Sequence, residues 1–265
     1  MATRTAVSIG LLCTVCVALL VTLPSAAHSQ ARASTNAAAV PRAADGKPDF
    51  TGFWDNPHPS GKAGGATVFD KSRFAPFKPG GEALFYEPRT GDPRHDEPRA
   101  FCMPSGFPSG LLGPYPIQMV QTPGWLVMVT EFQRITRLIP LDGRPHRDVE
   151  PTFYGDPVGH WEGDTLVVEN TNFKRWSLDD YYYQDATQYR MHSESVRMIE
   201  RMRRIDANTI NYELTIDDPK IFTAPWSQTF EMKLHPEWEK VGLYEFVCEE
   251  NNRCPGGNCR SADAR

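Results

Sequence analysis

The sequence predicts an all-β domain, built as an antiparallel barrel or a strongly curved sheet, with long loops and one short helix. Three observations support this fold class. Apolar and polar residues alternate over residues 209–216, as on a strand with one face in water. Turn-forming residues separate strand-like segments at short intervals, as at residues 122–124 and 162–164. The clearest helical stretch is short and covers residues 80–86.

The chain begins with the features of a secretory signal peptide. Arg4 precedes an apolar run over residues 9–21, and small residues follow Pro24. The apolar run is too short for a membrane span, so stable membrane insertion is not expected. We therefore expect residues 1–29 to be cleaved and the mature protein to be periplasmic or secreted.

The rest of the chain is predicted to be a single domain behind a short leader. Residues 30–44 are Ala-rich and aperiodic, which is typical of disorder. Residues 45–265 have the length of one β-barrel-like domain. The formal net charge of the full chain is −5 at pH 7, which argues against nucleic acid and anionic membranes as partners.

Four of the six cysteines fall in the mature chain, namely Cys102, Cys248, Cys254 and Cys259. An even number in an exported chain indicates disulfides. We expect Cys102 to pair with Cys248, and Cys254 to pair with Cys259 across a small loop. Zinc binding by these thiols is the weaker alternative, because a paired ligand set is missing and an oxidising compartment disfavours thiolates.

Strand signals begin at residues 52–54 and resume after a loop-rich region over residues 56–99. Loops of this length on a compact domain commonly cover or shape a binding site. The next strands are expected at residues 117–121, 125–132 and 133–141. Short turns separate these apolar runs, which favours an antiparallel meander.

Two hairpins are predicted in the second half of the chain. Residues 155–173 contain a Val- and Thr-rich strand after a Glu-Gly-Asp turn, in which Gly163 can adopt a positive φ. Residues 192–205 can be mistaken for a helix, but the turn after them and the alternating strand that follows favour a second hairpin. The last strands are expected at residues 225–234 and 242–248.

Several motifs together resemble a family of exported bacterial proteins, most of them uncharacterised. The resemblance covers nearly the whole mature chain and implies export and this fold, without a settled activity. The triplet at residues 52–54 also resembles the Gly-x-Trp signature of lipocalin-like (calycin) barrels, which implies a barrel with room for one small ligand. The family motifs are PDFTGFW (48–54), QTPG (121–124), DGRPH (142–146), GHWEGDTLVVE (159–169), HSE (192–194) and TIDDP (215–219).

His192 and Glu194 form the preferred catalytic pair. Residues i and i+2 of a strand project to the same face, so the two side chains would stand side by side. A carboxylate beside an imidazole orients the ring and makes it a general base. Arg197 or Tyr189 would then stabilise developing negative charge. The competing interpretation is that His192 and Glu194 make only structural contacts.

Aromatic residues supply the candidate contacts for a ligand. Four tyrosines lie in the segment 176–192, which either covers the domain or forms an aromatic lid over a ligand. His146, in a loop between two predicted strands, is expected to reach the barrel mouth. The complete set of ligand-contact candidates is Trp54, Tyr182, Trp226, Trp238 and His146.

The leading hypothesis is an exported lipocalin-like protein that binds a small, largely apolar molecule. An alternative is a cofactor-independent lyase, isomerase or hydrolase that uses His192 and Glu194 in the barrel cavity. A further alternative is a structural module of the cell envelope without a pocket. We expect neither a metal nor another cofactor, because dense His spacing, a phosphate loop and a dinucleotide fingerprint are missing.

Overall fold

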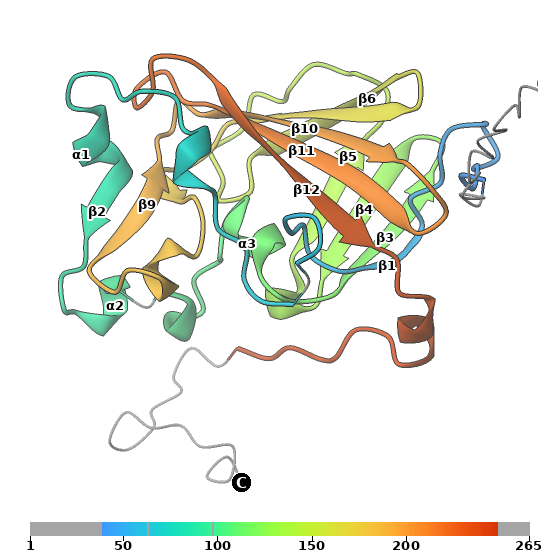
Figure 1. Ribbon diagram of the computed structural model, residues 1–265, viewed down its shortest axis with the longest axis horizontal. Coiled ribbons are helices and arrows are strands. Elements are labelled where there is room, and N and C mark those ends of the chain that lie inside the picture. Colours follow the sequence, from blue (N-terminus) through green and yellow to red (C-terminus); the bar gives the residue numbers. More distant parts are fainter. Residues whose placement is uncertain (1–38, 63, 97, 249–265) are drawn as a thin grey trace, which may run out of the picture. The chain divides into compact units, whose positions relative to one another are not determined.

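The computed structural model describes residues 39–248, apart from residues 63 and 97 (Figure 1). The expected signal peptide, residues 1–29, lies outside the described residues. Three antiparallel sheets dominate the regular structure, and the helices are short. The all-β prediction is therefore confirmed. None of the three sheets closes on itself within the described part of the chain, so a closed barrel stays a prediction.

The first sheet has four strands in the order β1-β3-β4-β5. β3 and β4 pair across a two-residue turn in which Thr122 lies opposite Trp125, as the turn signal indicated. A 3₁₀ turn at Phe132–Arg134 separates β4 from β5. The predicted meander is confirmed. Its strands are β1 (Gly52–Trp54), β3 (Ile117–Thr122), β4 (Trp125–Thr130) and β5 (Thr136–Pro140).

The second sheet has five strands in the order β12-β11-β10-β7-β6. Both predicted hairpins are present, β6–β7 and β10–β11, and Gly163 has a φ of 60° in the first of them. The alternative of a helix over residues 192–205 is wrong. The strands are β6 (Asp156–Glu162), β7 (Thr165–Thr171), β10 (Arg197–Arg204), β11 (Thr209–Asp217) and β12 (Trp226–Lys233).

A third, small sheet has the order β2-β9-β8, and the sequence did not predict it. Two of its strands lie in the segment 176–192, which was expected to be a loop. The prediction of a strand at residues 242–248 is wrong. This segment does not pair with any strand of the described chain. The strands of the small sheet are β2 (Tyr86–Pro88), β8 (Trp176–Ser177) and β9 (Gln188–His192).

The helices are single turns. α1 (Gly81–Phe85) lies where the helix was predicted, and α2 (Pro93–Asp96) and α3 (Ser109–Leu112) are additional. Among the described residues, none of the helices has the length and apolar character that a membrane span requires. Further 3₁₀ turns are η1 (Lys71–Arg73), η2 (Pro98–Phe101), η4 (Tyr181–Tyr183) and η5 (Pro236–Lys240).

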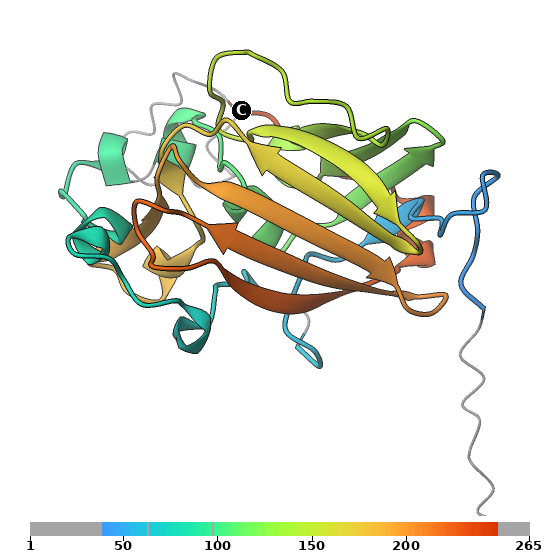
Figure 2. The same cartoon turned by 90° about the horizontal axis from the view of Figure 1, so that it is seen from above.

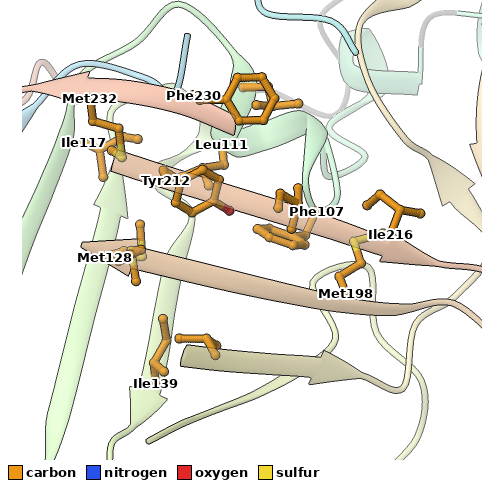
Figure 3. Close-up of a cluster of buried hydrophobic side chains, with 14 of the residues drawn as sticks. Phe107, Leu111, Ile117, Met128, Ile139, Met198, Tyr212, Ile216, Phe230 and Met232 are labelled. Carbon is orange, nitrogen blue, oxygen red and sulfur yellow. The ribbon is translucent and has the colours of Figure 1, made fainter. Parts of the chain in front are cut away.

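Side chains of the two large sheets fill the space between them (Figure 3). The first sheet contributes residues such as Met128 and Ile139, and the second contributes Met198 and Tyr212. The ligand cavity expected inside a barrel is therefore occupied by a close-packed core. Phe107 and Leu111, beside and within α3, belong to the same cluster, together with Ile117, Ile216, Phe230 and Met232.

The two large sheets also meet along their edges. Trp54 at the end of β1 forms an antiparallel bridge with Leu234, which follows β12. On the opposite side, Gly143 N donates to Gly159 O of β6 over 2.9 Å. Figure 2 shows the connection from β5 to β6, in yellow-green, as a long loop outside the sheets.

The described chain makes specific contacts before residue 45, where order was expected to begin. Arg42 forms a bridge with Pro48 and an ion pair with Asp164 in the β6–β7 turn, at 2.6 Å. The end of the predicted leader, residues 39–44, is thus held against the second sheet by a long-range ion pair. Residues 30–38 lie outside the described residues.

Candidate functional site

A cavity of about 370 Å³ lies beside the small third sheet and is the candidate site in which aromatic and titratable side chains meet. We call it the tyrosine pocket. β2, β8 and β9 supply one part of its wall, and the segment between α2 and α3 supplies another. Its lining residues are Glu87, His95, Asp96, Arg99, Met103, Pro104, Ser105, Ser109, Trp176, Ser177, Tyr182, Tyr189 and Met191.

One wall of the tyrosine pocket is aromatic and apolar. The rings of Tyr182 and Tyr189 lie 5.4 Å apart between centroids, and both residues are buried. Met191 completes this small cluster. Trp176 is fixed by its indole Nε1, which donates to Pro104 O over 3.0 Å. The pocket thus presents rings that are already held in place, which lowers the entropy cost of binding a flat apolar molecule.

His95 lies between two carboxylates of the pocket lining. Its Nε2 is 3.1 Å from Glu87 Oε1, and its Nδ1 is 3.0 Å from Asp96 Oδ1. Burial acts to raise the pKa of Asp96, but hydrogen bonds from Thr90, His95 and Gly91 outweigh it and hold the pKa well below its usual range. Glu87 also pairs with Arg175. The carboxylates that flank His95 therefore already have partners within the protein.

A second charged group joins three segments at the pocket. Arg99 Nη2 lies 3.1 Å from Asp180 Oδ1, and Ser109 Oγ donates to the same oxygen over 2.8 Å. The Arg99 guanidinium lies 5.2 Å from the centroid of the Tyr182 ring, within range of a cation–π contact. This arrangement neutralises Arg99 and places its guanidinium over the Tyr182 ring.

The predicted disulfide between Cys102 and Cys248 is present, with a Cα–Cα distance of 5.7 Å. It connects the last described residue to the chain directly before Met103, which lines the pocket. Arg134 Nη2 donates to Leu243 O over 2.8 Å and holds the same C-terminal segment. Cys254 and Cys259 lie outside the described residues.

The expected pairing of His192 with Glu194 does not form. β9 ends at His192 and the chain turns directly afterwards, so the two side chains lose the strand alternation on which the expectation depended. His192 is buried, its Nδ1 lies 3.1 Å from Ser193 O, and burial lowers its pKa to about 4. Glu194 instead lies 3.5 Å from Lys220 Nζ. A buried neutral imidazole without a carboxylate partner does not match the expected general base.

The remaining predicted catalytic residues lie apart from His192. Arg197, on β10, is exposed and pairs with Glu169 of β7. Tyr189 lies in the tyrosine pocket, where its hydroxyl donates to Asp96 O. The structure therefore brings Tyr189 together with Tyr182, a predicted ligand contact, rather than with the predicted base.

Only Tyr182 of the predicted ligand contacts lines the tyrosine pocket. Trp54 is fully buried in the core, and its Nε1 donates to Phe50 O. Trp226 packs edge-on against Phe69 in the same core. Trp238, on η5, stacks on His235 at 3.9 Å between ring centroids.

His146, in the connection from β5 to β6, contacts β6 and β7 of the second sheet. Its Nδ1 lies 2.8 Å from Asp156 O, and its Nε2 is 3.4 Å from Glu169 Oε1. These contacts fix the β5–β6 connection to the second sheet. Over residues 39–248 apart from 63 and 97, no three His, Cys, Asp or Glu side chains come together in a way that could hold a metal ion.

Sequence reasoning missed most of the pocket wall. His95 and Arg99 belong to a charged, Pro-containing stretch whose sequence predicts a loop, and no local signal marks Trp176 as a site residue. Their proximity depends on β2 pairing with β9, which joins segments about a hundred residues apart. The local signal in this region is the dense alternation of charged residues and Pro near residue 95, which indicates an irregular segment but not a pocket wall.

No protein-family model matches the chain, and no curated protein matches it. The resemblance to exported bacterial proteins therefore stays a prediction, and the function is inferred from the geometry described above.

Proposed function

We propose that the protein binds a small, largely apolar molecule in the tyrosine pocket. One observation carries this proposal: the charged side chains of the wall are paired with one another or with neighbours, while rings and thioethers line the cavity. A charged ligand would have to separate these pairs, which costs free energy. An apolar ligand would instead cover the accessible parts of Trp176, Tyr182 and Met103. Removing this apolar surface from water contributes favourably to the free energy of binding.

The size and position of the cavity support the same function. A volume of about 370 Å³ lies within the range of small-molecule sites. The cavity lies beside the third sheet, outside the packed core of the two large sheets. We call the protein lipocalin-like because the two large sheets face each other and meet at both edges. The proposed ligand site differs from that of a lipocalin because the interior is filled.

Export is part of the proposal. The Cys102–Cys248 disulfide supports it, because disulfides form and persist in oxidising compartments. The order of Arg4, an apolar run and small residues at the start of the chain supports it as well. A binder of this kind would meet its ligand in the periplasm or outside the cell.

The test uses N-phenyl-1-naphthylamine, a neutral probe that fluoresces in apolar surroundings. We expect saturable binding by the wild-type protein and an affinity about tenfold lower for Tyr182→Ala, because the ring contact contributes about 1 kcal/mol or more. Trp238→Ala is the matched control, since it removes an aromatic ring from η5, away from the pocket lining. Equal affinities of the two variants would contradict the proposal.

A cofactor-independent hydrolase, lyase or isomerase is the second candidate function. The observation that favours it is the Asp96–His95 pair, in which Asp96 holds Nδ1 while Nε2 faces Glu87 at the pocket wall. A substrate that displaced Glu87 would leave Nε2 to act as general base. A screen with nitrophenyl esters tests this: activity that survives His95→Gln would contradict it.

A further inference from the structure

A second cavity, of about 310 Å³, lies between β5 and the first half of β6, and Trp125 of β4 also lines it. It shares no lining residue with the tyrosine pocket. The end of β5 lies close to the middle of β6, where a Cβ on Gly159 would lie only 3.2 Å from Pro140 O. The loop that follows β5, drawn in yellow-green in Figure 2, contributes Arg144, Pro145 and Arg147 to the lining.

Three arginines line this space, which we call the arginine cavity. Arg137 comes from β5, and Arg144 and Arg147 come from the loop. Asp156 also lines the cavity and pairs with Arg147 at 2.6 Å. Arg137 pairs with the buried Glu200 and Arg144 pairs with the exposed Asp142, two carboxylates that do not line the cavity. The lining itself therefore presents more guanidinium than carboxylate groups, which suits an anion that can use the remaining guanidinium donors.

The arginines keep hydrogen-bond donors that their ion pairs do not use. Arg144 contacts the exposed Asp142 through Nε and Nη2, and Arg147 contacts Asp156 through Nε and Nη2. Within the described residues, neither Nη1 has a hydrogen-bond partner. Arg137 is buried, and its Nε also has no partner in that part of the chain. A guanidinium with free donors is suited to carboxylate oxygens.

The rest of the cavity wall is apolar. Trp125 and Leu138 are exposed large hydrophobic residues of β4 and β5, and both line the cavity. The guanidinium of Arg144 lies 5.0 Å from the centroid of the Trp125 ring. Tyr154, whose pKa burial raises to about 12, stays neutral and adds a further ring. An anion with an apolar body would therefore contact both kinds of surface.

We propose that the arginine cavity is a second ligand site, which binds a small organic carboxylate with an apolar body. Its carboxylate contacts the free donors of Arg144 and Arg147, and its apolar body packs against Trp125 and Leu138. This site does not depend on the function proposed for the tyrosine pocket. The two sites take ligands of different charge, so a binding test can separate them.

Benzoate is the probe, with inorganic phosphate for comparison, and binding is measured by titration calorimetry at low ionic strength. We expect saturable binding of benzoate by the full mature chain. Arg144→Gln and Arg147→Gln are each expected to weaken it about tenfold or more, since a lost charge-assisted hydrogen bond has about that effect. Both side chains are largely exposed, so the variants are expected to fold, which circular dichroism checks.

Arg42→Gln is the matched control. Arg42 is as exposed as Arg144 and also pairs with one carboxylate, but that carboxylate is Asp164 in the β6–β7 turn. Its loss removes the same charge without touching the cavity. Benzoate binding that falls equally in all three variants, or that never saturates in the wild type, would overturn the proposal. Phosphate binding as tight as that of benzoate would overturn the role of the apolar wall.

Discussion

Arg137 of β5 and Glu200 of β10 form a buried ion pair that joins the two large sheets across the core. Arg137 Nη1 lies 3.0 Å from Glu200 Oε2, and Tyr212 Oη donates to the same oxygen over 2.9 Å. The Arg137 guanidinium lies 4.1 Å from the centroid of the Phe107 ring. Both charges are removed from water, and an unpaired buried charge costs several kcal/mol. The two sheets can therefore pack here only if Arg137 and Glu200 pair with each other.

Replacing Glu200 alone is expected to be strongly destabilising. Glu200→Gln leaves the Arg137 charge buried without a counter-charge, and the expected loss in the free energy of unfolding is about 3–5 kcal/mol. Urea unfolding followed by circular dichroism measures it. The double variant Arg137→Met with Glu200→Gln is expected to lose less than the sum of the single losses. Simple additivity would show that the two side chains are not coupled.

Acid is expected to destabilise the protein through His192. Burial lowers its pKa from 6.5 to about 4 in the folded state, so the unfolded state binds the proton more readily. Stability from this group is complete above pH 6.5 and is lost as the pH falls toward 4, by about 3 kcal/mol. We expect His192→Gln to show a smaller loss between pH 7 and pH 4 in urea unfolding. An identical loss in both proteins would contradict the role of His192.

The Cys102–Cys248 disulfide is expected to stabilise the fold substantially. It joins cysteines 146 residues apart, and a loop of that length corresponds to about 4–5 kcal/mol in the chain-entropy description. The double variant Cys102→Ser with Cys248→Ser is expected to lose a comparable free energy of unfolding. Reducing agent should destabilise the wild type in the same way and leave the double variant nearly unchanged. A large effect of reductant on the variant would point to the other cysteine pair.

Two glycines in similar backbone conformations are expected to respond differently to alanine. Gly155 and Gly163 have φ values of 73° and 60°, so both substitutions strain the backbone by about 1 kcal/mol. A Cβ at Gly163 meets open space, whereas one at Gly155 would lie 2.2 Å from Asn170 Oδ1. Gly155→Ala should therefore lower the thermal midpoint more than Gly163→Ala. Equal midpoints would mean that Asn170 moves aside at no cost.

The hairpins were predictable because their signals are local. Turn residues at 162–164 and 206–208 lie between segments whose alternation shows which face is buried. The third sheet was not predictable in this way. β2 and β8 have three and two residues, too few to show a period, and they form only because β9 pairs with both.

The same distinction explains the site. Tyr182 and Tyr189 were singled out because aromatic residues cluster in one segment, and both line the pocket. His95, Arg99 and Trp176 come from segments that only the tertiary fold brings together. The pairing of His192 with Glu194 failed because strand alternation was extended past the residue where β9 ends. Where a strand ends depends on its partners, which local sequence does not show.

The bridge between Trp54 and Leu234 joins residues 180 positions apart, a separation that raises the contact order of the fold. Segments from nearly opposite ends of the described chain must meet before the edge between β1 and β12 is covered. During synthesis or export, which begins at the N-terminus, the edge of β1 therefore stays exposed until the chain up to Leu234 has emerged. Such topologies fold slowly, and their intermediates carry open strand edges that invite aggregation. We expect chaperones that shield those edges to increase the yield of native protein.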